Sequence, residues 1–219
     1  MNDSAPPIPH ERRWRPAVAI VTVLALIAYL PDRLRPFGDW FPYACAVAIL
    51  VPMIGVGFSG TSFWLRLERA VVLVFFVINQ VFTMIMLARL FNEMAFHARE
   101  INGIWLLASS VSIWVGNVLT YALAYWQLDR GGPEARKNNA GVKPDWLFAS
   151  DSAPEGDVIA GWRPTFPDYL FLGFTTATAF SPTDALPLTV RAKMLMMVES
   201  TVSLATIIFV AARAINILA

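Results

Sequence analysis

The chain has few charged residues and almost no cysteine or histidine. Of its 219 residues, 15% are charged, one is cysteine and two are histidine. The single cysteine, Cys45, cannot form a disulfide within the chain, so cysteine usage says little about the redox compartment. With a formal net charge of +1, no basic stripe is present to neutralise phosphates, and we expect no nucleic-acid partner.

Motifs for catalysis and metal binding are also absent. The sequence contains no His-Glu-x-x-His, no Gly-x-Ser-x-Gly and no glycine-rich phosphate loop. Only His10 and His97 could serve as imidazole bases, and no residues have metal-ligand spacing. We therefore expect no enzyme activity, no catalytic residues, no bound metal and no cofactor.

What the sequence has instead is apolar length. Hydrophobic residues make up 57% of the chain, and mean hydropathy is +0.54. Its charged fraction of 15% is well below the roughly 25% of an ordinary soluble domain. At 1.5 Å per residue, about 30 Å of hydrocarbon requires about 20 residues of helix. The sequence thus predicts an all-α, polytopic helical membrane protein with about five transmembrane helices, at residues 16–30, 41–58, 70–88, 104–126 and 194–212.

The first of these segments is short and follows three arginines, so a cleaved signal peptide is the alternative. Its end, Ala28-Tyr-Leu-Pro31, lacks the small-x-small cleavage pattern, and we expect a retained helix. The chain then divides into one membrane domain with four parts. These are a polar tail at 1–15, four transmembrane helices at 16–128, a solvated loop at 129–165, and a hairpin with the last transmembrane helix at 166–219.

Residues 167–184 form a short apolar stretch that runs into threonines and small residues and leads directly to the last spanning segment. The stretch is too short to cross a bilayer comfortably. This layout is typical of a re-entrant helix and loop, because irregular backbone is tolerated at membrane depth where it lines a cavity or is buried in protein. We expect the function to lie in this hairpin.

Glu199 is the only acidic residue within an apolar spanning segment. Insertion scales disfavour such a group by about 2.5 kcal/mol or more, so it needs a partner, a proton or water. Ser203 and Thr206 follow on the same helical face. Two interpretations stay open: the face lines a hydrated path, or Glu199 pairs with an arginine such as Arg191 or Arg89 while the hydroxyls bond their own backbone.

The third and fourth apolar segments carry further polar residues, and close helix packing accounts for them without a ligand. These residues are Asn79, Gln80, Thr83, Ser110, Asn117 and Thr120.

The C-terminal quarter resembles the hairpin of a bacterial integral-membrane family catalogued as a domain of unknown function. The stretch Phe174-Thr-Thr-Ala-Thr-Ala-Phe180, then Asp184, Arg191 and Lys193, follows the order of that family without a gap. The resemblance implies a fold more than an activity. It also implies a place in the bacterial inner (plasma) membrane.

The hairpin is more distantly similar to the pore module of two-helix cation channels. Phe174-Thr175-Thr176, Asp184 and Glu199 occupy corresponding places. Potassium filters resemble Thr-Val-Gly-Tyr-Gly, whereas residues 176–182 contain no glycine, so selectivity by that mechanism is not expected. A channel-like loop enters from outside and needs an external N-terminus, whereas the distribution of lysine and arginine favours an internal one.

The leading hypothesis is a pore-loop-like protein that conducts or binds a small monovalent cation or a proton. It would act as a homo-oligomer, a tetramer if it forms a pore, because one copy supplies one loop. The candidate pore-lining or ion-lining residues are Thr175, Thr176, Thr178, Ser181, Asp184, Glu199, Ser203 and Thr206.

Two alternatives remain. The first is a non-conducting membrane subunit or assembly factor of a larger complex, with an aromatic surface that packs on a partner protein or lipid. That surface comprises Phe166, Tyr169, Phe171, Phe174 and Phe180. The second is a proton-coupled transporter in which Glu199 is the proton site.

Overall fold

The computed structural model describes residues 13–30, 38, 40–59, 61–96, 103–138, 141–154, 156–158, 161–179 and 185–218. Within this part the chain is nearly all helical, as predicted. The α-helices are α1 Trp14–Tyr29, α2 Trp40–Ser59, α3 Ser62–Phe96, α4 Gly103–Leu128, α5 Pro133–Lys137, α6 Phe166–Ala179 and α7 Val190–Leu218. Two 3-10 turns, Asp129–Gly131 and Ala149–Asp151, and two short strands, β1 Trp146–Phe148 and β2 Ala185–Pro187, complete the described elements.

Four helices are long and apolar enough to cross a membrane. The candidate spans are Trp40–Phe58, Ser62–Asn92, Leu107–Gly131 and Val190–Ala211. The first predicted segment forms α1, whose 16 residues are apolar but shorter than these spans; at 1.5 Å per residue it covers about 24 Å. The chain is an integral membrane protein.

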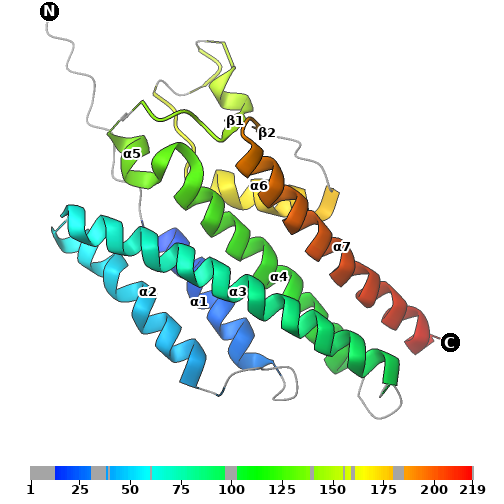
Figure 1. The fold of residues 1–219 in the computed structure, drawn as a ribbon. Coiled ribbons are helices and arrows are strands. Elements are labelled where there is room, and N and C mark those ends of the chain that lie inside the picture. The colour runs from blue at the N-terminus through cyan, green and yellow to red at the C-terminus, as the bar shows by residue number, and fades with distance from the viewer. Residues whose placement is uncertain are drawn as a thin grey trace, which may run out of the picture.

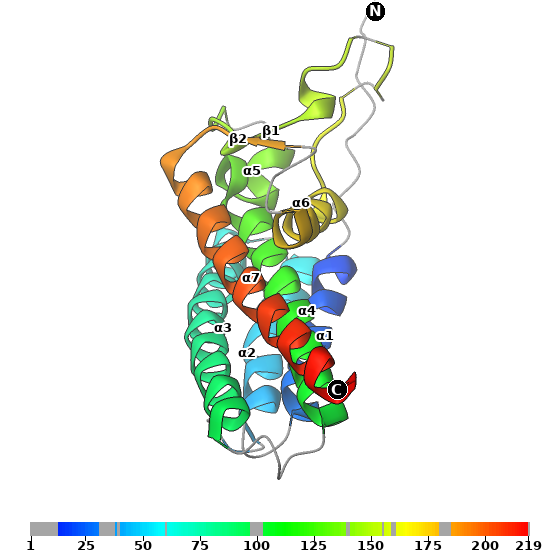
Figure 2. The same cartoon turned by 90° about the vertical axis from the view of Figure 1, so that its right-hand side faces the viewer.

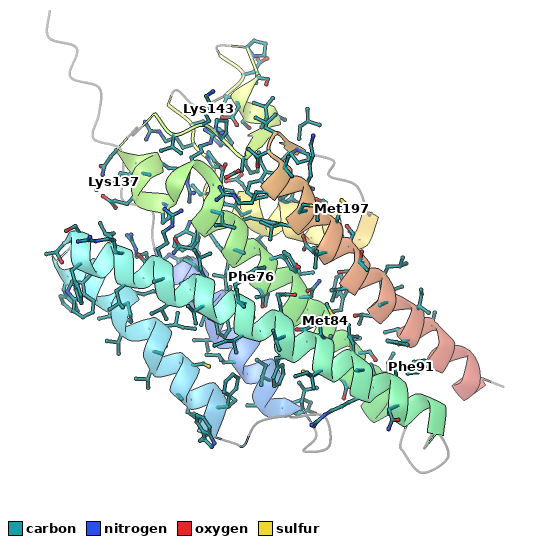
Figure 3. The ribbon with its side chains drawn as sticks, viewed as in Figure 1. Phe76, Met84, Phe91, Lys137, Lys143 and Met197 are labelled. Carbon is teal, nitrogen blue, oxygen red and sulfur yellow. The ribbon has the colours of Figure 1, made fainter. Side chains whose placement is uncertain are left out.

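Helix α4 is the centre of the bundle. It packs against α1, α3, α6 and α7, and Figures 1 and 2 show it running lengthwise between α7 and the group of α1 and α3. Every residue from 121 to 127 in α4 is buried, which is the pattern of a helix that contacts protein on all sides. Exposed apolar side chains such as Met84, Phe91 and Met197 lie instead along α3 and α7, where lipid can cover them (Figure 3).

The α3–α4 contact contains a polar pair. The Asn79 side-chain amide donates a hydrogen bond of 2.8 Å to the Thr120 hydroxyl, which itself donates to the Gly116 carbonyl at 2.7 Å. The packing interpretation is confirmed for Asn79 and Thr120. The first hydrogen bond joins α3 to α4, and the second lies within α4.

Helix α6 is short and lies across the bundle. Its start follows from the sequence Thr165-Phe-Pro-Asp168, because the Asp168 carboxylate accepts hydrogen bonds from the Thr165 backbone N–H at 2.7 Å and the Thr165 hydroxyl at 2.9 Å. Figure 1 shows α6 crossing the direction of α4 and α7, and Figure 2 shows it end-on. The loop that would make it re-entrant, residues 180–184, lies outside the described residues.

Residues 129–165, predicted as a solvated loop, pack against the bundle in their described part. Strand β1 pairs antiparallel with β2, placing Trp146 opposite Pro187 and Phe148 opposite Ala185. Trp146 and Phe148 are both buried. The loop is therefore tied to the start of α7, because apolar burial of these aromatic side chains favours a packed cap over a solvated chain. We call the described residues from 129 to 165 the cap.

Candidate functional site

Glu199 lies in the first half of α7 and is completely buried. Its Oε2 atom accepts a hydrogen bond from the hydroxyl of Tyr125, which comes from α4 and is also completely buried. Its Oε1 atom has no hydrogen-bond partner among the described residues. The carboxyl group is thus half satisfied, which is uncommon for a buried polar group.

Asn117 and Ser203 form a second contact between the same two helices. The Asn117 side-chain amide donates to the Ser203 hydroxyl at 3.1 Å and lies 3.4 Å from the Glu199 backbone carbonyl. Its Oδ1 atom has no hydrogen-bond partner in the described part of the chain. Asn117 and Tyr125 are about two turns apart on one face of α4. Glu199 and Ser203 are about one turn apart on one face of α7. We call Asn117, Tyr125, Glu199 and Ser203 the Glu199 cluster.

Helix α6 closes the third side of this cluster through a glycine. A Cβ atom at Gly173 would lie 3.2 Å from the Val118 carbonyl oxygen and 3.3 Å from Glu199 Oε1. The absence of a side chain therefore lets α6 approach both α4 and the carboxyl group closely. Thr176, one turn further along α6, is buried, and its hydroxyl has no hydrogen-bond partner among the described residues. Its backbone carbonyl accepts the Ser200 hydroxyl at 3.2 Å.

Aromatic side chains cover the cluster on the side of the cap. The Tyr125 ring lies 4.7 Å, centroid to centroid, from the ring of Trp146, whose indole N–H points to the Met196 sulfur at 3.2 Å. Tyr169 packs edge-on against Phe148, with centroids 5.4 Å apart. Trp146 of the cap thus packs directly on Tyr125, a member of the cluster.

The cap holds its own buried carboxylate, Asp129. Its Oδ1 accepts the backbone N–H of Asp145 at 2.7 Å, and its Oδ2 accepts the Tyr169 hydroxyl at 2.6 Å. Tyr169 lies in α6, outside the four candidate spans. Burial raises the pKa of the Tyr169 hydroxyl well above its ordinary value, outweighing the opposite effect of Arg136. Tyr169 therefore remains a neutral donor to Asp129 near neutral pH.

The predicted site residues separate into three groups. Glu199 and Ser203 meet in the cluster, and Thr176 faces the same helix junction. Three hydroxyls instead bond the backbone of their own helix. Thr175 donates to Phe171 O and Leu172 O, both at 3.0 Å, Thr178 donates to Phe174 O at 2.8 Å, and Thr206 donates to Val202 O at 2.8 Å. Ser181 and Asp184 lie outside the described residues.

One part of the packing interpretation is wrong. The partner of the Glu199 side chain is the Tyr125 hydroxyl, not Arg191 or Arg89. Arg191 instead pairs with the buried carboxylate of Asp145 in the cap. Sequence reasoning missed the role of Tyr125, although its spacing of eight residues from Asn117 places both side chains on one face of α4.

The site offers oxygen atoms but no cluster typical of a transition-metal centre. Among the described residues, no group of three or more histidine, cysteine, aspartate or glutamate side chains could hold a metal ion. The atoms that could accept a proton or a small hard cation are Glu199 Oε1 and Asn117 Oδ1, neither of which has a partner in the described structure.

Comparison with protein-family models found no match for this chain, and comparisons with curated proteins and with solved structures found none either.

Proposed function

We propose that this membrane protein binds a proton or a small monovalent cation at the Glu199 cluster and moves it across the membrane. The observation that carries the proposal is the Glu199 carboxyl group, which is fully buried with Oε2 bonded to Tyr125 and Oε1 without a partner among the described residues. A buried carboxyl group that lacks an arginine or lysine partner needs a proton or a cation to balance its charge.

The tight packing around Oε1 favours a proton over a larger ion. Gly173 brings the α6 backbone against the carboxyl group, and any side chain there would already be in close contact with Oε1. A proton requires no additional volume, whereas a cation needs several oxygen ligands around it. Asn117 Oδ1 is a further acceptor in the same cluster.

Conduction through a central pore would need several copies, with the hairpins of a homo-oligomer around a symmetry axis. In that arrangement Asp184 concentrates cations at the mouth and Glu199 adds negative field along the path. Binding at Glu199 itself needs only one copy, because the cluster forms within the chain.

The test is ion flux in liposomes that contain the purified protein. Proton, sodium and potassium flux should be measured for the wild type, for Glu199→Gln and for Asp184→Asn. A matched control is Thr201→Val, because Thr201 is exposed on α7 and its hydroxyl bonds only the Met197 carbonyl, at 2.8 Å. The proposal predicts flux that falls about tenfold or more in Glu199→Gln and persists in the control. A folded, oligomeric wild type without flux of any of the three ions contradicts it.

A second candidate is the non-conducting membrane subunit or assembly factor. Two of the five aromatic residues first assigned to its surface, Phe166 and Tyr169, are buried within the chain, whereas Phe171 and Phe174 are about half exposed on α6. Only these two are available to a partner protein or lipid among the described members of the set. Extraction in a mild detergent discriminates: a stoichiometric foreign protein supports the subunit, and a homo-oligomer supports the pore.

Proton-coupled transport is the third candidate and uses the same carboxyl group. It predicts substrate uptake that is driven by a proton gradient and lost in Glu199→Gln.

A further inference from the structure

The cap contains a cavity that is separate from the Glu199 cluster. It has a volume of about 350 Å³ and is lined by three arginines, Arg130, Arg136 and Arg163, together with small and apolar residues such as Gly141 and Trp162. None of the described residues that line it is acidic. A hollow with this lining attracts anions, because a cleft lined by one sign of charge concentrates counter-ions.

Two of these arginines are held in place by backbone carbonyls. Arg136 Nη1 donates to Trp126 O at 2.7 Å and to Asp129 O at 2.9 Å. Arg163 Nη1 donates to Lys137 O at 2.9 Å and to Arg136 O. Carbonyl acceptors orient a guanidinium group without adding a full negative charge. The remaining nitrogens of Arg163, Nε and Nη2, have no partner among the described residues.

Arg130 also interacts with two carboxylates. It pairs with Asp151, and its Nε lies 3.4 Å from Asp129 Oδ2. Asp129 also accepts hydrogen bonds from Tyr169 and from the Asp145 backbone. Neither carboxylate lines the cavity, so the charged side chains on its described wall are the three arginines.

The backbone of Arg130 is also unusual. Its φ of +52° is the only positive φ at a non-glycine residue in the described chain, and Gly131 and Gly132 follow with φ of +80° and +99°. Residues other than glycine adopt this conformation at an energetic cost, and such outliers cluster at ligand sites. Arg130, which lines the cavity, lies in this turn.

The cavity lies where a candidate span ends. The span Leu107–Gly131 includes Arg130, and the other lining residues belong to the cap that follows. Figure 3 shows Lys137 and Lys143 at this same end of the molecule. A site at the end of a membrane span lies at the depth of lipid headgroups.

We propose that this cavity binds a phosphate group, carried either by an anionic lipid headgroup or by a free phosphate compound. Arginine suits this ligand because its planar guanidinium group donates two parallel hydrogen bonds to phosphate oxygens. Arg163 supplies its Nε and Nη2 atoms, which have no partner among the described residues. Arg130 and Arg136 add positive charge, and Trp162 offers an apolar wall to the rest of the ligand.

The test is binding to the full-length protein in a nonionic detergent, measured by calorimetry with three probes. The probes are dioctanoyl phosphatidylglycerol, inorganic phosphate, and dioctanoylglycerol, which has the same tails without phosphate.

The variants are Arg163→Gln and Val142→Glu. Val142 lines the cavity and is 49% exposed, so the second variant adds a negative charge beside the arginines without removing a side-chain hydrogen bond. The matched control is Arg66→Gln, an exposed arginine of α3 that bonds Ser62 O at 3.2 Å within its own helix.

The proposal predicts that phosphatidylglycerol or phosphate binds the wild type, that both cavity variants weaken binding about tenfold or more, and that the control does not. Binding of the lipid alone identifies a headgroup, and binding of both probes identifies a free phosphate compound. The proposal is overturned if neither probe binds, if dioctanoylglycerol binds equally well, or if Val142→Glu binds like the wild type.

Discussion

The hydroxyl of Tyr125 in α4 donates a hydrogen bond to the carboxyl group of Glu199 in α7, and both side chains are fully buried. The two residues are 74 positions apart, so the contact depends on how α4 packs against α7. It leaves the second carboxyl oxygen without a partner in the described structure. A protonatable group at this position can respond to the proton or cation content of its surroundings.

Removal of the Tyr125 hydroxyl should destabilise the fold. In Tyr125→Phe, Glu199 loses the donor to Oε2, and an unsatisfied buried acceptor costs about 1–3 kcal/mol. The free energy of unfolding in detergent, from chemical denaturation, measures the effect. The control is Tyr43→Phe, because Tyr43 is 69% exposed, and a change there should stay within about 0.5 kcal/mol. Equal stability of the two variants would sink this assignment.

A methyl group at Gly173 should push α6 away from the cluster. In Gly173→Ala the new Cβ lies within 3.3 Å of both Val118 O and Glu199 Oε1, and overpacking of this kind costs about 1–3 kcal/mol. Thermal unfolding of the purified protein measures it.

The matched control for this change is Gly57→Ala in α2, where a Cβ meets nothing within 4 Å. That control should be neutral or stabilising by up to about 1 kcal/mol, because alanine favours helix over glycine. If Gly173→Ala is as stable as Gly57→Ala, α6 does not approach Glu199 as closely as described.

The hydrogen bond between Asn79 and Thr120 should make a modest contribution to the α3–α4 contact. Thr120→Val removes the hydroxyl at nearly constant volume, and hydrogen bonds between membrane helices contribute about 0.6 kcal/mol on average, with a maximum near 1.7 kcal/mol. A double-mutant cycle with Asn79→Ala isolates the pair. A coupling energy of zero would show that the two side chains do not interact in the membrane.

The buried Tyr169 hydroxyl should make the stability of the fold depend on pH in the alkaline range. Because burial raises the pKa of its hydroxyl in the folded state, its contribution to stability is complete below the ordinary tyrosine pKa of about 10 and is lost as pH rises beyond it. Between about pH 8 and pH 11, the melting temperature should therefore fall less steeply in Tyr169→Phe than in the wild type. Parallel curves for the two proteins would contradict this assignment.

The helices were predictable because apolar length is a local property of the sequence. Residues 194–212 already indicated α7, and Glu199 stood out as a charge within it. The packing of Trp146 was not predictable, because β1 has three residues, too few for a period, and its partner β2 lies about 40 positions later. Tyr125 was missed for a related reason. An aromatic residue in an apolar helix gives no sign of which polar group its hydroxyl will meet.

For the threonines of α6, the sequence pattern overstates the number of hydroxyls that face a path. Their number suggested a lined path, yet Thr175 and Thr178 donate to carbonyls one turn earlier in their own helix. This is what a threonine in a helix does when no other acceptor is near. Thr176 differs because its hydroxyl is buried without a partner among the described residues, and only the three-dimensional contacts separate it from its neighbours.

The central claim, that the Glu199 carboxyl group takes up a proton or a cation within the membrane, is tested most directly by infrared spectroscopy of the protein in liposomes. Spectra of the wild type and Glu199→Gln should be compared while pH and the sodium or potassium concentration are varied. We predict a carboxyl band that responds to pH or to the cation in the wild type and is absent from Glu199→Gln. Identical difference spectra for the two proteins would contradict the account.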